Sequence, residues 1–161
     1  VDTAVQHCRV GAPSEANDMT NGTRLTLCAG AIWKDERSHG PRQTGHPPIP
    51  DSAVKDSGCT GYNYKEAPTV CAEGTGNSHG GSHQMLRDKL EKRMRDHVEN
   101  NRSSSMSYES YRNHAIMIFY ETFPESRCDR KCLRAQLDAH YKCPKALKAV
   151  SGKGGGDSGN F

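Results

Sequence analysis

Three histidines, His46, His79 and His83, combine a residue type and a spacing that suit metal-dependent hydrolysis. His79 and His83 are four residues apart where a helical pattern begins, and side chains at i and i+4 share one face of a helix. His46 comes from a strand-like segment earlier in the chain. Neutral imidazole binds divalent metals of borderline softness, and its pKa near neutrality also suits a general base. If the fold brings the three together, they could hold one divalent cation and activate water.

Apolar spacing predicts the elements that would position these histidines. Residues 69–72 form a short apolar run between Pro68 and Gly74, which indicates a strand. A helix is expected over residues 81–98, with Ser82 as its N-cap and His83 in its first turn. Its core-facing stripe repeats at i+4 and comprises Leu86, Leu90, Met94 and Val98.

Two further helices are expected over residues 107–123 and 129–141. Aromatic residues of the first, Tyr108, Tyr111, Phe119 and Phe123, follow helical spacing and are expected in the core rather than stacked on bases. The prolines after His46 predict an extended segment. The coarse order is therefore strand, long loop, strand, helix, and then more helices.

Composition predicts a thin core that needs additional support. Only 33% of the 161 residues are hydrophobic and 16 are glycine. Such a core usually depends on disulfides, a metal or a partner. A net charge of +3 is compatible with nucleic acid without requiring it. No apolar stretch approaches the length needed to insert into a membrane.

Seven cysteines allow three interpretations: disulfides, a structural zinc site on Cys128, Cys132 and Cys143, or buried thiols. Disulfides are the favoured interpretation for this cysteine content, but the sequence does not fix their pairing. The chain divides by composition into a loop-rich arm (residues 1–40), a core (41–98), a helical extension (99–150) and a flexible Gly-rich tail (151–161).

Three motifs carry a family resemblance: TGHPPIP at residues 44–50, YNYKEAPTVCAEGT at 62–75 and GGSH at 80–83. Together they resemble the GHH-signature toxin nucleases of the HNH/endonuclease VII superfamily. The resemblance covers roughly residues 42–98 and extends weakly to about Cys143. It implies an α+β fold with a small ββα-metal core, short strands and additional peripheral helices.

The resemblance also implies a function and a setting. Members of the family hydrolyse DNA with a divalent metal, so the resemblance implies Mg, Mn, Zn or Ni as the cofactor. They act as C-terminal domains of polymorphic toxins and type VI secretion effectors, which are delivered into the cytoplasm of a rival bacterium and countered by a cognate immunity protein. The start at Val1 suggests a piece of such a larger effector chain.

One departure from the family concerns the signature itself, because Gly-His-His is replaced by Gly45-His46-Pro47. His46 is therefore expected either as general base or as metal ligand, and a third reading is that Pro47 marks an attenuated enzyme. His79 and His83 are expected to hold the metal. The family's further histidine is here Arg87, which cannot ligate a metal but can hold a phosphate.

Three other residues are weighed for supporting roles. Asn77 could orient a ligand or base, or simply form a turn beside Gly76. Glu73 could act as a ligand or could be solvated at the end of its strand, and His39 is a reserve base. The basic residues of the 81–98 helix could face DNA or form an ordinary solvated face. Two other functions are possible: a non-catalytic binding domain whose small core is stabilised by metal or disulfides, and an RNase that uses the same site.

Overall fold

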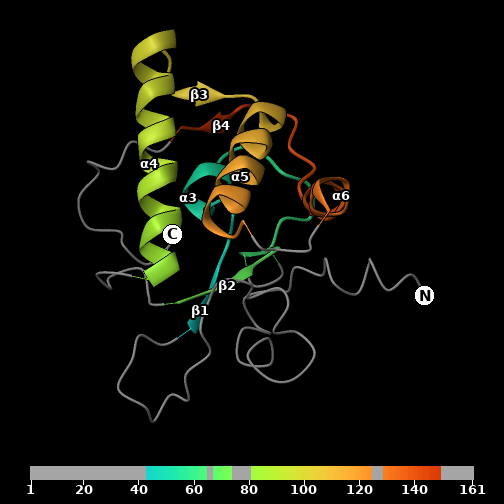
Figure 1. The fold of residues 1–161 in the computed structure, drawn as a ribbon. Helices are drawn as coiled ribbons and strands as arrows, with labels where there is room; N and C mark the ends of the chain where they lie inside the picture. The colour runs from blue at the N-terminus through green and yellow to red at the C-terminus, as the bar shows by residue number, and fades with distance from the viewer. Residues whose placement is uncertain (1–42, 65–66, 74–80, 125–128, 150–161) are drawn as a thin grey trace.

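A computed structural model describes residues 43–64, 67–73, 81–124 and 129–149, and it shows the expected mixture of helices with short strands (Figure 1). The arm at residues 1–40 and the tail at 151–161 lie outside the described residues. Strand β1 (Gln43–His46) pairs antiparallel with β2 (Val70–Glu73), and His46 stands opposite Val70. Both strands are where the sequence predicted them, so the α+β class is confirmed.

Three long helices follow the pair of strands, and each matches its predicted range to within three residues. They are α4 (Gly81–Asn101), α5 (Tyr108–Thr122) and α6 (Arg130–His140). The prediction that Ser82 caps α4 is wrong, because the helix already begins at Gly81, in the left-handed region with φ 81°. His83 nevertheless lies in the first turn, as expected.

The structure also contains elements that the sequence did not predict. A short helix, α3 (Asp51–Val54), begins after Pro50 where an extended segment was expected. Two-residue strands β3 (Ser105–Met106) and β4 (Leu147–Lys148) pair antiparallel and bring the end of the described chain back beside α4 (Figure 1).

The core forms where one face of α4 packs against β2 and α5. Leu86, Leu90 and Met94 are buried and Val98 packs partly buried beside them, so the predicted stripe is confirmed. The aromatic residues predicted for the core lie there too: Tyr111, Phe119 and Phe123 are buried, and Tyr108 packs against the cluster.

A disulfide joins Cys59 to Cys143, which are 84 positions apart in the sequence. It ties the turn after α3 to the segment after α6, where Thr60 N also donates a hydrogen bond of 2.8 Å to Lys142 O. The zinc site proposed on Cys128, Cys132 and Cys143 is therefore wrong, since the Cys143 sulfur is already bonded. Within the described ranges, no helix combines the length and apolar character needed to cross a bilayer.

Candidate functional site

His46 and His83 meet although they lie on separate pieces of backbone. His46 is the last residue of β1, and His83 is in the first turn of α4. Their ring centroids are 4.6 Å apart and the ring planes are nearly perpendicular, at 85°. The strand pairing and the contact between α4 and β2 produce this meeting, because they bring the end of β1 beside the start of the helix. The convergence that the sequence predicted for these two histidines is therefore present.

Both imidazoles are buried, with 2% of each residue exposed, and each Nδ1 atom has no hydrogen-bond partner among the residues that the structure describes. Burial is the main reason that the pKa of each ring falls, well below its usual value for His46 and to about 4 for His83. The positive charge of Arg87 lowers both pKa values further. Both rings are therefore neutral near pH 7, the form that binds a metal or accepts a proton.

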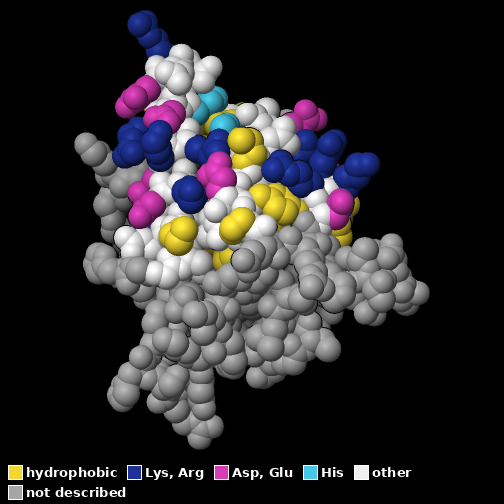
Figure 2. All heavy atoms as spheres, viewed as in Figure 1, with side chains coloured by type: hydrophobic (Ala, Val, Ile, Leu, Met, Phe, Trp, Pro, Cys, Tyr) yellow, Lys and Arg dark blue, Asp and Glu magenta, His cyan; other side chains and the backbone are white. Residues whose placement is uncertain are grey.

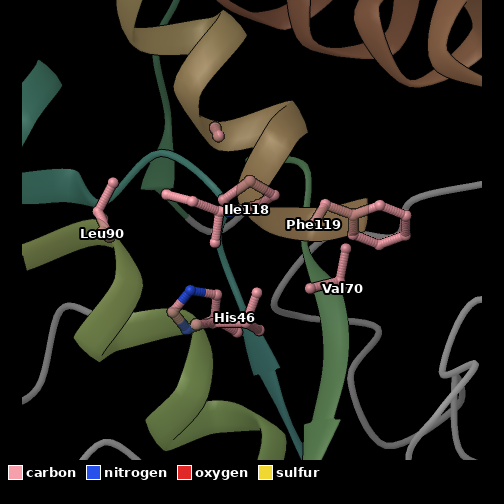
Figure 3. Close-up of a pocket in the computed structure, with 8 residues that line it drawn as sticks. His46, Val70, Leu90, Ile118 and Phe119 are labelled. Atoms are coloured by element: carbon pink, nitrogen blue, oxygen red, sulfur yellow. The ribbon is translucent and has the colours of Figure 1, made fainter. Parts of the chain in front are cut away.

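An apolar wall stands behind His46 (Figure 3). It encloses a cavity of about 10 Å³, which is at most the space of one water molecule. The cavity is lined by His46, Pro48, Val70, Leu86, Leu90, Ala115, Ile118 and Phe119. The sequence predicted several of these residues as core but did not link them to His46, because that link depends on how α5 packs. The wall fixes the ring and excludes bulk water from one of its sides.

Arg87 lies one turn after His83 on α4, and its side chain is 17% exposed. Its Nε is 3.8 Å from the Asp88 carboxylate, a loose ion pair. The guanidinium is close enough to lower the pKa of both histidines. It therefore places a positive charge next to the imidazole pair, as a phosphate-binding group requires.

The other predicted site residues are not placed by the structure. His79, Asn77 and His39 lie outside the described residues. Glu73 ends β2, opposite Gln43, but its side chain is outside the described part of the chain. Their roles therefore stay predictions.

The donor set fits a divalent cation in part. His46 and His83 supply two neutral imidazoles with unpartnered nitrogens, which are donors that zinc and nickel accept. Among the described residues, no group of three or more His, Cys, Asp or Glu side chains converges on one point. Further ligands would have to come from water, substrate or residues outside the described ranges.

The basic residues of α4 are largely occupied by neighbouring carboxylates. Lys89 and Arg93 pair with Glu121 of α5, with a Lys89–Glu121 distance of 3.4 Å, and Lys92 pairs with Asp96 at 2.9 Å. Arg93 also approaches Nδ1 of His114 at 3.4 Å. Of the two predictions for the basic residues of this helix, the ordinary solvated, ion-paired surface therefore fits this part of α4 better than a surface free to bind phosphate.

One curated relative is the DNase toxin Tse7 of Pseudomonas aeruginosa, which is 31% identical to the chain over 121 residues. The aligned region covers 63% of the chain but only 31% of that relative, so the chain spans about a third of the relative's length. No solved structure shows significant similarity to the chain.

A sequence model of one protein family matches residues 43–141, which is more than half of the chain. The family is described as the GHH-signature-containing HNH/Endo VII superfamily nuclease toxin 2. The match begins with β1, includes both histidines of the buried pair and ends just after α6, and it confirms the resemblance inferred from the three sequence motifs. The chain therefore belongs to this family of nuclease toxins.

Proposed function

We propose that this domain hydrolyses phosphodiester bonds in the DNA of a competitor bacterium, with a divalent metal ion, as the toxic part of a larger effector. The family supports nuclease chemistry, and the similarity to a DNase toxin of Pseudomonas supports DNA as substrate. The observation that carries the proposal is the His46–His83 contact of 4.6 Å between neutral, buried imidazoles. Delivery by a secretion apparatus and control by a cognate immunity protein belong to the same proposal.

Each residue has a specific task in this proposal. His83 would hold the cation from the first turn of α4, together with His79. Such a cation stabilises negative charge on the phosphate and on the leaving oxygen. His46, neutral and fixed by its apolar wall, either accepts the proton of the attacking water at an imidazole nitrogen or completes the coordination of the metal. Arg87 holds a non-bridging phosphate oxygen with its guanidinium group.

Pro47 leaves His46 as the single histidine of the signature segment. It replaces the second histidine of the family signature, is buried and has no backbone N–H. The signature therefore supplies a single imidazole, which either activates water or ligates the metal. Zn and Ni suit the two described imidazoles directly, whereas Mg and Mn would need water and phosphate oxygens as most of their ligands.

Plasmid cleavage tests the assignment directly. Purified wild-type protein is incubated with supercoiled plasmid and each of the four metals, beside His46→Ala and His83→Ala. His97→Ala is a matched control, because His97 is on the same helix as His83 but bonds Ser105 O near the other end. We expect each site variant to lose about 100-fold or more in rate, while the control keeps wild-type activity. Equal nicking by all four proteins would reject the assignment.

Metal titration by calorimetry separates the two roles of His46. If His46 is the base, His46→Ala keeps the wild-type metal affinity while losing cleavage. If it is a ligand, metal affinity and cleavage are lost together, as expected for His83→Ala.

Labelled DNA and RNA digested side by side decide between a DNase and an RNase, and faster cleavage of RNA would contradict the proposed substrate.

A further inference from the structure

A second hollow lies between α5 and α6, separate from the His46–His83 site. Its volume is about 360 Å³, and its lining consists of Asn113, Ile116, Met117, Arg130, Lys131 and Arg134. Figure 2 shows Lys and Arg side chains gathered over α6 next to hydrophobic side chains at the surface. We call this hollow the α5–α6 groove.

The groove combines an apolar floor with a cationic wall. Ile116 and Met117 come from α5, and Met117 is 42% exposed, one of two large hydrophobic side chains exposed among the described residues. Arg130, Lys131 and Arg134 are exposed on α6, and none of the lining residues is acidic. Methionine adapts to different partner shapes, and Met and Arg are enriched at the centres of protein interfaces.

The two described carboxylates of α6, Asp129 and Asp138, offset the charge of this wall only in part, because each also accepts hydrogen bonds from other groups. Asp129 caps the helix by accepting from the backbone N–H groups of Lys131 and Cys132, at 2.7 and 3.4 Å. Asp138 accepts from Arg112 at 3.1 Å and from Tyr108 at 2.9 Å. It is 3.8 Å from Arg134, a loose ion pair whose arginine side chain stays 60% exposed.

The position of the groove distinguishes it from the proposed DNA-cleaving site. Ala115, Ile118 and Phe119 of α5 line the cavity beside His46, whereas Ile116 and Met117 line the groove. At 3.6 residues per turn these two sets lie on different sides of α5. A molecule seated in the groove therefore leaves the imidazole pair uncovered, and DNA held at that pair would have to pass around α5 to reach α6.

From this combination we infer that the α5–α6 groove docks an acidic segment of a protein partner. The segment inserts an apolar side chain between Ile116 and Met117 and places carboxylates against Arg130, Lys131 and Arg134. Charge complementarity selects an acidic ligand, and the apolar floor favours a protein segment over a nucleic-acid backbone, whose outer edge consists mainly of charged phosphate oxygens. The inference does not depend on the nuclease activity.

The two exposed methionines make the test specific, because Met117 lies in the groove and Met85 lies on α4, outside the groove. The full chain is labelled at the methionine methyl carbons and followed by NMR in the presence of chelator. The probes are a Glu-rich synthetic peptide with leucine at every fourth position, the same peptide with lysine for glutamate, and a short DNA duplex. We expect only the acidic peptide to shift the Met117 signal, in a saturable manner, with the Met85 signal unchanged.

Charge-reversing variants complete the test. Lys131→Glu with Arg134→Glu is expected to weaken binding of the acidic peptide by about tenfold or more, because both are exposed and face the groove. The control, Lys142→Glu with Lys145→Glu, makes the same change of charge at exposed residues outside the groove and should leave binding unchanged. Three results would overturn the inference: no shift of Met117 with the acidic peptide, equal weakening by both variants, or a shift of Met117 by DNA.

Discussion

Removing the Cys59–Cys143 bridge should cost the domain a large part of its stability. The bridge joins residues 84 positions apart, so it removes many conformations from the unfolded chain. For a loop of this length the chain-entropy relation gives about 4.5 kcal/mol. Domains of ordinary size are stable by only about 5–15 kcal/mol, so this loss would be felt at 37 °C.

The experiment compares wild-type protein with the double variant Cys59→Ser, Cys143→Ser. Urea unfolding followed by far-UV circular dichroism gives the free energy of unfolding of each protein. Cys132→Ser is the matched control, because Cys132 is half-buried on α6 and lies outside this bridge. We expect a loss of about 3–5 kcal/mol for the double variant and less than about 1 kcal/mol for the control.

Hydrogen bonds close to the bridge should preserve the native arrangement once the bridge is gone. Thr60 N still donates to Lys142 O, and Ser57 Oγ still donates to Ala146 O at 3.1 Å. The double variant should therefore fold at low temperature and unfold at a lower urea concentration. A free energy of unfolding within about 0.5 kcal/mol of wild type would refute the reasoning, because it would show that the bridge does not restrict the unfolded chain.

Three other outcomes follow from packing, capping and burial. Leu90 is 2% exposed and already borders the cavity beside His46, so Leu90→Ala should cost about 3–4 kcal/mol in urea unfolding, with the exposed Met85→Ala nearly neutral as control. Asp129→Ala removes the N-cap of α6 and should lower the free energy of unfolding by about 1 kcal/mol in the same measurement. Burial, together with the charge of Arg93, lowers the pKa of His114 in the folded protein. As the pH drops below 6.5 the unfolded chain therefore takes up this proton first, and the free energy of unfolding falls. His114→Gln should make that decline shallower, and an unchanged dependence of stability on pH would contradict the assignment.

The sequence predicted those parts of the fold whose signal is local. The i+4 repeat of Leu86, Leu90 and Met94 located α4, and the apolar run before Gly74 located β2. His46 and His83 could be paired in advance only because the motifs resemble a family whose layout joins them. The periodicity within β1 or α4 does not predict that the end of the strand meets the start of the helix.

Apart from the short local helix α3, the features that escaped prediction depend on distant partners. Strands β3 and β4 are two residues long, too short to show alternation, and they exist because residues far apart in the sequence pair. The partner of Cys143 was equally invisible, since several pairings of seven cysteines are possible. The groove combines α5 and α6 and so has no contiguous motif. Glu121, which pairs with Lys89 and Arg93 across two helices, likewise appeared only in three dimensions.

The pairing of β1 with β2 also determines where this domain can tolerate a change of length. Side chains alternate between the faces of a strand, so one residue inserted within Gln43–His46 would turn the imidazole of His46 to the opposite face. Around Gly61 the chain turns at the surface, and a side chain built there would meet nothing within 4 Å, so added residues cost less at this point. Homologues should accordingly vary in the length of that turn region and keep the four-residue strand free of insertions and deletions.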